Sequence, residues 1–285
     1  MQFNNYEDIV QMTPLWKGDR FPDGRPRVAD SVLARLRSMS IEEVWRLAWM
    51  KLNNYQFQGD FKCTHSTMKP TVGRAVTATF VPIREDLEIA MMRQAKSQGM
   101  KGMYNQWVVD SLVEDDVFVA DLFDKTEYGT LVGGNLATVI RQKTKRGGAV
   151  VWGSIRDVQQ IRDIDDINIF YRGFHPSPIR DICLTGFNSP CRIGHATCLP
   201  GDVVYACECG VCFIPPHMAE EVAEDAEKVH IRDIFGFQRI HEGKYSATAI
   251  DEFPWKIEIF EDFMNWLKTD ERAAPYRHLT WEKER

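Results

Sequence analysis

The chain has 285 residues and a formal net charge of −6, and apolar residues fill 44% of its positions. A chain of this length forms one large domain or two small ones and buries about three quarters of its unfolded surface. The negative charge argues against nucleic-acid and anionic-membrane surfaces, because these need clustered Lys and Arg. The start lacks the basic region and apolar run of a signal peptide, and no stretch reaches the ~18 apolar residues of a membrane span. The 7 cysteines are odd in number, which does not suit a secreted disulfide framework. We therefore expect a cytoplasmic protein without a disulfide framework.

The N-terminal region is rich in proline, glycine and arginine from Trp16 to Val28. Its prolines exclude a helix, so we expect a solvated tether. The alternative is that Trp16 and the three arginines Arg20, Arg25 and Arg27 lie over the pocket of a neighbouring subunit. Two helices are predicted before the first strand from apolar residues at helical spacing. They carry Val32, Leu33 and Leu36 in the first helix, and Val44, Leu47 and Ala48 in the second, which Ser40 caps.

Strands and helices alternate in the middle of the chain. The apolar run Arg74–Val81 predicts a strand, and Arg84–Gln98 predicts a helix that ends near Gly99. Further helices are expected at His217–Lys228 and, in an acidic, aromatic C-terminal region, at Phe253–Lys268. This order predicts an α/β protein with a mixed sheet. The remaining predicted strands are Asp116–Asp124, Ala149–Trp152, Ile167–Tyr171, Ile182–Thr185, Val203–Ala206 and Val211–Ile214.

A glycine turn at Gly133–Leu136 opens a helix expected from Leu131 to Arg146, and the pair Arg156 and Asp157 follows the next strand. Backbone N–H groups at the start of a helix suit a carboxylate. The carboxyl end of a strand is where α/β proteins usually bind ligands, and the Arg-Asp pair offers an anion contact and a metal ligand there. Together these features predict a small metal-assisted site for a keto acid.

The order of these motifs resembles the RraA-like family, which includes class II pyruvate aldolases that cleave hydroxymethyl-oxoglutarate and the ribonuclease regulator that gives the family its name. Besides the glycine turn and the Arg-Asp pair, the similar segments are VGRAVTATF, DVFVADLFD, NIFYRGFHPSP and CRIGHATCLPGDVVYACECGVCFIPPHMAEEV. The similarity is collinear over roughly residues 40–230. It implies the family's swivelling β/β/α sandwich with extra N- and C-terminal helical segments. We therefore expect an N-terminal extension (1–40), an RraA-like domain (41–230) and a C-terminal helical extension (231–285).

The resemblance also implies a lyase that releases pyruvate by retro-aldol cleavage or decarboxylates oxaloacetate. Asp157 would hold Mg²⁺ or Mn²⁺, largely through water, and Arg156 would contact the substrate and stabilise the enolate. Backbone N–H groups of Gly134, Asn135, Leu136 and Ala137 would hold the substrate carboxylate. The family's usual assembly implies a homotrimer, or a hexamer of two stacked trimers, with pockets at the subunit interfaces.

Two positions depart from the family's pattern. The aldolases commonly carry an acidic residue where this chain has Asn135, and an amide supplies neither negative charge nor a base. The closing hairpin has Cys207 and Cys209 where acidic residues are expected. The retained Arg-Asp pair favours an enzyme, whereas these departures favour a different activity, such as a lyase for a sugar-acid derivative or a non-catalytic regulatory protein. An acid from a neighbouring subunit is the other alternative, and the acidic C-terminal segment is the candidate for it.

The cysteines allow a second kind of site. Cys207, Cys209 and Cys212 form a CECGVC segment, and soft thiolates favour Zn²⁺ or an Fe–S cluster. There is one CxxC and no second pair at zinc spacing, and strand alternation places Cys207 and Cys209 on one face. We therefore expect cysteines that pack in the core. The others near this segment are Cys183, Cys191 and Cys198.

Two further residues are candidates for the site. His175 is a candidate general acid near the pocket mouth, and Arg172 is a candidate for binding a second substrate carboxylate. The alternatives are a histidine that packs in a loop and an arginine with a structural role.

Overall fold

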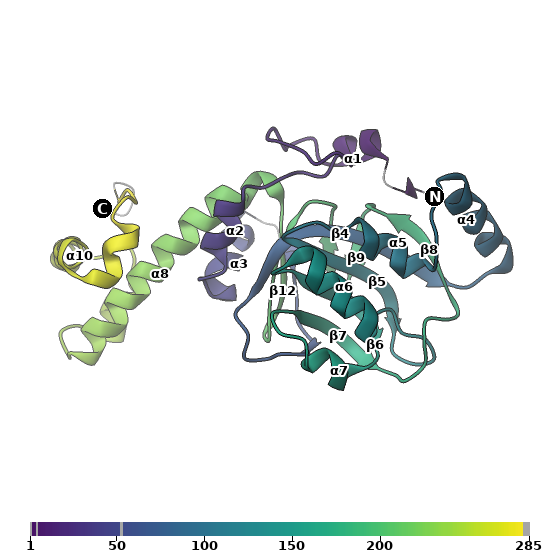
Figure 1. Ribbon diagram of the computed structural model, residues 1–285. Coiled ribbons are helices and arrows are strands. Elements are labelled where there is room, and N and C mark those ends of the chain that lie inside the picture. Colours follow the sequence, from purple (N-terminus) through teal and green to yellow (C-terminus); the bar gives the residue numbers. More distant parts are fainter. Residues whose placement is uncertain (1, 4, 52–53, 282–285) are drawn as a thin grey trace.

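The computed structural model describes residues 2–3, 5–51 and 54–281. Its centre is a 10-stranded mixed sheet of order β2-β12-β11-β4-β5-β6-β7-β3, in which β8 also pairs with β4, and β1 with β8 (Figure 1). The four strands β4 to β7 are parallel, and β8 and β11 run antiparallel to β4. The strands are β1 Gln2–Phe3, β2 Phe57–Gln58, β3 Lys62–Cys63, β4 Thr71–Pro82, β5 Asp116–Lys125, β6 Gly148–Ile155, β7 Asn168–Phe174, β8 Ile182–Phe187, β9 Cys191–Ile193, β10 Ala196–Cys198, β11 Val203–Cys207 and β12 Gly210–Ile214.

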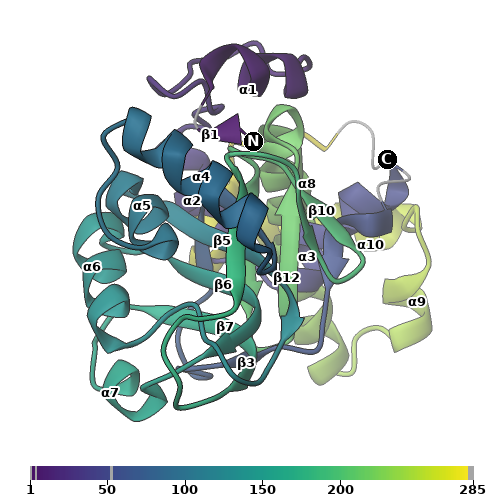
Figure 2. The same cartoon turned by 90° about the vertical axis from the view of Figure 1, so that its right-hand side faces the viewer.

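Helices α4 to α7 cover one face of the parallel strands, and a short β9–β10 hairpin covers the other (Figure 2). Successive residues of β5 point to opposite faces of the sheet. Phe118 and Ala120 pack under the helices, and Val117 and Val119 pack under the hairpin. Burial on both faces explains the nearly continuous apolar runs of β4, β5 and β6. This mixed α/β arrangement confirms the expected fold class.

The helices differ from the sequence prediction in number and length. Their bounds are α1 Tyr6–Met12, α2 Asp30–Leu36, α3 Ile41–Met50, α4 Glu85–Ser97, α5 Tyr104–Ser111, α6 Gly134–Thr144, α7 Val158–Arg162, α8 Ala219–His241, α9 Ala247–Asp251 and α10 Ile257–Thr269. Short 3₁₀ turns lie at Asn54–Gln56, Pro216–Met218 and Glu271–Tyr276. In the described part of the chain, no helix has the length and apolarity needed to cross a membrane.

Several of the helix predictions are wrong, and the last helix, α10, begins at Ile257 rather than at Phe253. A third helix, α1, precedes the two that were expected. Helix α6 begins at Gly134, because Gly133 has extended backbone angles and forms its N-cap. Helix α8 continues beyond Lys228 to His241, because Ile231 and Phe235 extend its buried stripe.

The second half of α8 projects from the sandwich and carries the C-terminal helices (Figure 1). An aromatic core joins Phe235 of α8 to Trp255, Phe263 and Trp266, and it is separate from the cores around the sheet. The ring centroids of Phe235 and Phe263 are 5.3 Å apart. The expected boundary between residues 230 and 231 therefore falls within one continuous helix, which the C-terminal segment shares with the main domain.

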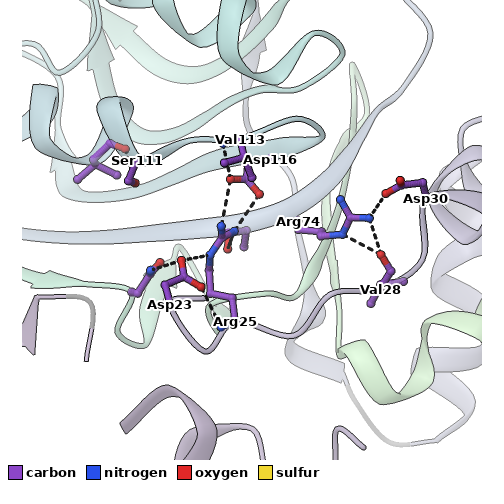
Figure 3. A network of polar contacts seen from close by, with 11 residues as sticks. Asp23, Arg25, Val28, Asp30, Arg74, Ser111, Val113 and Asp116 are labelled. Carbon is purple, nitrogen blue, oxygen red and sulfur yellow. Dashed lines mark hydrogen bonds and ion pairs between the residues drawn. The ribbon is translucent and has the colours of Figure 1, made fainter. Parts of the chain in front are cut away.

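The arginine-rich N-terminal loop is not a solvated tether (Figure 3). Arg25 is 2% exposed, and its Nη1 lies 2.8 Å from Oδ1 of the fully buried Asp116. Its Nε lies 2.7 Å from Asp23 Oδ2. Nearby, the buried Arg74 Nε donates to the carbonyl oxygen of Val28 at 2.8 Å. These contacts hold the loop across the amino ends of β4 and β5. The buried Asp116 carboxylate needs a charged partner, and Arg25 of the loop supplies it.

Candidate functional site

Two connections at the carboxyl end of the parallel strands form the site. One leads from β5 to Gly133 and the start of α6, and the other leads from β6 through Arg156 and Asp157 into α7. Two backbone hydrogen bonds join them, from Leu131 N to Ser154 O at 3.0 Å and from Arg156 N to Val132 O at 2.9 Å. The segments are therefore held side by side although more than twenty residues separate them, as in the predicted spacing.

Asp157 contacts the glycine turn directly. Its Oδ2 accepts a hydrogen bond from Gly134 N at 3.0 Å and lies 3.7 Å from Nε of Arg156. The Arg156 and Asp157 side chains are 38% and 30% exposed, so both are open to a ligand. Asp157 has a left-handed backbone (φ 57°), which Asp and Asn tolerate better than most residues. The structure therefore brings together the two parts of the predicted site.

The side chains of Arg156 and Asp157 approach Gly133 so closely that they leave no space for a Cβ there. Its φ of −125° suits any residue, but a Cβ there would lie 2.7 Å from Asp157 Oδ2 and 2.8 Å from Arg156 Nε. A Cβ on Gly134 would come too close only to Gln160 Oε1, at 2.7 Å, which ends a flexible side chain, while Asp157 Cβ would lie at an ordinary contact distance of 3.8 Å. The two glycines thus have different roles.

Fewer backbone N–H groups are available to a carboxylate than the sequence predicts. Ala137 N donates within the helix to Gly133 O at 3.0 Å, so its N–H does not reach a ligand. Gly134 N already donates to Asp157. The backbone N–H groups of Asn135 and Leu136 donate to no other described residue, and the Asn135 side chain is exposed. Asn135 and Leu136 remain as the free donors of the turn.

A pocket of about 160 Å³ opens beside these donors and Arg156. Apolar side chains form one wall, and Asn105 of α5 belongs to the polar part. The buried Asn105 Nδ2 donates to Leu131 O at 2.6 Å and so fixes the loop before the glycine turn. Sequence reasoning missed Asn105 because no motif marks it. The lining residues are Met103, Asn105, Gln106, Thr130, Leu131, Gly133, Asn135, Leu136, Arg156, Pro178 and Ile179.

His175 lies between two other hollows of the same region. One, of about 560 Å³, also includes Asp157, and the other, of about 540 Å³, includes Arg172. His175 Nδ1 accepts from Ser177 N at 3.2 Å, which places the proton of the neutral ring on Nε2. The centroids of the His175 and Tyr128 rings are 5.0 Å apart. His175 therefore packs in its loop and lines one hollow together with Asp157.

Arg172 is engaged in contacts within the chain. Its Nε lies 3.1 Å from Asp124 Oδ1, and its Nη1 donates to Asp60 O. Its guanidinium group also lies 4.5 Å from the ring centre of Trp152. These contacts favour the structural reading of Arg172 over a cation reserved for a second substrate carboxylate.

Four of the cysteines pack in the core as expected, namely Cys183, Cys191, Cys198 and Cys212. Burial raises the pKa of Cys212 to about 12, so its thiol stays protonated. The expectation fails for Cys209, which is exposed in the turn between β11 and β12, while Cys207 is half-buried. Within residues 2–3, 5–51 and 54–281, no group of three or more His, Cys, Asp or Glu side chains is arranged to hold a metal ion.

Comparisons with known proteins give the family. A solved structure of Streptomyces coelicolor RraAS2, described as an unusual member of the RNase ES inhibitor RraA family, is 21% identical, covers 75% of this chain and 100% of its own, and has a TM-score of 0.63. An uncharacterized protein from Pseudomonas syringae is 18% identical, with 81% and 96% coverage and a TM-score of 0.63. At these identities, the likeness concerns the fold.

Sequence comparison extends the agreement. The uncharacterized protein MJ0644 of Methanocaldococcus jannaschii is 25% identical over 149 residues, which are 51% of this chain and 71% of that protein. The model of the RraA-like family, described as Aldolase/RraA, matches residues 30–213, and this span contains the glycine turn, Arg156 and Asp157. The chain therefore belongs to the RraA-like family, which includes metal-dependent aldolases and non-catalytic members of the RNase-inhibitor type.

Proposed function

We propose that the protein is a divalent-metal-dependent lyase that acts on a 2-keto acid, by retro-aldol release of pyruvate or by decarboxylation of oxaloacetate. The observation that carries this proposal is the direct hydrogen bond between Asp157 Oδ2 and Gly134 N, with Arg156 beside it. One small region thereby offers a carboxylate, a guanidinium and free backbone N–H groups. A keto acid that chelates a metal ion requires these three kinds of contact.

The donor set suits Mg²⁺ or Mn²⁺. Asp157 is a partly exposed carboxylate, and a single protein carboxylate with water molecules is a common way to hold Mg²⁺. A bound divalent ion would supply Lewis-acid stabilisation of an enolate oxygen. Asp157 would orient that ion, and the hydrogen bond from Gly134 would keep the carboxylate in place.

The chain's own groups would bind and polarise the substrate. The Arg156 guanidinium donates no hydrogen bond to any residue that the structure describes, so its N–H groups are available for the enolate oxygen. The N–H groups of Asn135 and Leu136 would hold the substrate carboxylate at the helix N-terminus. Such donors are already oriented before the reaction, which is how they stabilise developing charge.

A proton donor is the incomplete part of this site. Asn135 stands in the turn where an acid is common in the aldolases, and the pocket beside Arg156 is lined by no carboxylate among the described residues. The Nε2 proton of His175 is one source. The other is an acid from a neighbouring subunit of a homotrimer or hexamer, since the C-terminal helices of the same chain lie far from α6 (Figure 1).

A non-catalytic regulatory role is the second candidate, and the amide of Asn135 is the observation that favours it. A related lyase that acts on a sugar-acid derivative is the third. The regulatory role makes no use of a metal ion or of the Arg156 guanidinium. Metal removal therefore distinguishes the regulatory role from the two lyase candidates, and the choice of substrate distinguishes the two lyases.

The test is pyruvate release from oxaloacetate and from hydroxymethyl-oxoglutarate by the full-length protein, first with a chelator and then with Mn²⁺ or Mg²⁺ added back. We expect turnover that the chelator abolishes and the metal restores. Arg156→Lys should lower kcat by about 10²-fold, because one preorganised donor is lost. Absence of turnover with both substrates in folded protein would contradict the keto-acid proposal, and metal-dependent turnover of a sugar acid instead would favour the third candidate.

A further inference from the structure

A further pocket lies at the other end of the parallel strands, away from the glycine turn. Its volume is about 230 Å³, and its walls come from the N-terminal segment, the turn before β11 and the residues after β12. Hydrogen bonds from Ala75 N to Asp202 O and from Gly201 N to Ala75 O attach this turn to β4 near its amino end. The lining residues are Met12, Thr13, Pro14, Leu15, Trp16, Gln56, Thr197, Leu199, Asp202, Pro215, Pro216 and His217.

Asp202 is the charged group of this pocket. Its side chain is 2% exposed, and its Oδ2 accepts from Leu199 N at 2.7 Å. Its Oδ1 accepts no hydrogen bond from any residue that the structure describes. A largely buried carboxylate keeps few water contacts, so a ligand that donates a hydrogen bond to its second oxygen is favoured. The pocket therefore presents an acceptor that has no donor among the described residues.

The remainder of the wall is mainly apolar. The Trp16 ring belongs to it, and its Nε1 donates to Asp19 O at 2.8 Å, which fixes the indole. A dry apolar cavity of about 150 Å³ holds a molecule of the size of benzene. The larger volume here accommodates one ring together with a short substituent. Neither a Lys nor an Arg side chain lines this pocket within the described part of the chain.

We propose that this pocket binds a small primary amine with an apolar, ring-sized body, whose ammonium group pairs with the Asp202 carboxylate. An anion is repelled by Asp202, and a purely apolar molecule leaves Oδ1 without a donor. An ammonium group gives the missing hydrogen bond and a charge of the opposite sign. This proposal does not depend on the lyase reaction.

The pH dependence of binding follows from the groups around Asp202. Burial raises the pKa of Asp202 to about 7. Burial also raises the pKa values of the neighbouring Cys198 and Cys212 thiols, and it lowers the pKa of His217, so these three groups are neutral near pH 7. Asp202 therefore ionises between pH 6 and pH 8, and the amine is charged throughout this range. Affinity for the amine should rise about tenfold from pH 6 to pH 8, because the ionised fraction of Asp202 rises by that factor.

The test uses phenethylamine as the probe, with calorimetry and ligand-observed NMR on the full-length protein. We expect binding at pH 8 that phenylacetate and ethylbenzene do not reproduce. Asp202→Asn keeps an acceptor for Leu199 N and should weaken the affinity at least about tenfold, because the charge is lost. Asp19→Asn, an exposed carboxylate of the same segment, should leave the affinity unchanged.

Two results would overturn the proposal. One is failure of phenethylamine to bind the folded wild-type protein at millimolar concentration. The other is equal affinity in Asp202→Asn, checked for folding by circular dichroism. If Asp202→Asn does not fold, the wild-type pH profile decides, because affinity that is the same at pH 6 and pH 8 contradicts a role for this carboxyl group.

Discussion

At the scale of single residues, the proposed site depends on close contacts that leave no space for additional atoms. Gly133 has an ordinary extended backbone, yet its missing side chain is what allows Arg156 and Asp157 to approach the turn. The sequence predicts a glycine turn, but it does not show which of the two glycines is needed for space. That distinction depends on side chains that lie more than twenty residues later in the chain.

Gly133→Ala should displace the Arg156 and Asp157 side chains, because the new Cβ would lie within 3 Å of each. We expect kcat/KM for the keto acid to fall by about 10²-fold, the scale of a 1 Å misplacement in an active site. Gly134→Ala is the matched control, since only the flexible Gln160 amide must move. Steady-state kinetics of both variants, with circular dichroism as the folding check, test this. Equal losses in the two variants would contradict the assigned role of Gly133.

At the scale of secondary-structure elements, α3 and α8 are joined by a titratable pair. His230 Nδ1 of α8 lies 3.0 Å from Glu43 Oε1 of α3. The hydrogen bond to Glu43 raises the pKa of His230 above its usual value, while burial opposes the shift. A raised histidine pKa stabilises the fold below the unfolded-state pKa of about 6.5, and this stabilisation is lost as the pH rises through the folded-state pKa.

His230→Gln should therefore lower the free energy of unfolding at pH 5.5 by about 1 kcal/mol, the scale of one intramolecular hydrogen bond. The difference from wild type should shrink by pH 9, where His230 is neutral in both the folded and the unfolded state. His241→Gln, at an exposed position in the last turn of the same helix, should show no such trend. Urea unfolding at the two pH values measures the effect. A deficit that grows with pH would contradict the assignment.

Most elements of the domain could be predicted because their signals are local. The apolar run of β4 identifies a buried strand, and the glycine turn identifies the start of α6. Helix α8 was predicted too short, because Ile231 and Phe235 are buried against the distant Trp255 and Phe263. The role of Arg25 could not be predicted at all, since its partner Asp116 lies 91 residues away in sequence. Contacts of this kind depend on topology, which periodicity does not reveal.

At the scale of the whole molecule, the N-terminal segment is part of the domain. Arg25 joins it to the buried Asp116 at the amino end of β5 (Figure 3). Residues of the same segment form one wall of the pocket that Asp202 lines. The C-terminal helices form an arm on the projecting half of α8 (Figure 1). We infer that such an arm is suited to reach a neighbouring subunit, in the homotrimer or hexamer that we propose.

Arg25→Met should destabilise the protein by about 3–5 kcal/mol, because it leaves the Asp116 carboxylate buried without its partner. Adding Asp116→Asn should recover much of this loss, since the amide oxygen still accepts from Val113 N and no charge stays buried. Arg27→Met, at an exposed position of the same loop, should cost little. Thermal and urea unfolding measure these differences. No recovery in the double variant would contradict the proposed cost of the uncompensated charge.

The central claim is that Asp157, placed by the glycine turn, serves a metal-dependent lyase. The most direct measurement is the rate of pyruvate release in saturating Mn²⁺ for wild type, Asp157→Asn and the exposed control Asp163→Asn. Asn keeps the left-handed backbone and the acceptor for Gly134 N while removing the charge. The account predicts loss of at least about 10²-fold in Asp157→Asn and none in Asp163→Asn. Turnover in Asp157→Asn equal to that of wild type would contradict it.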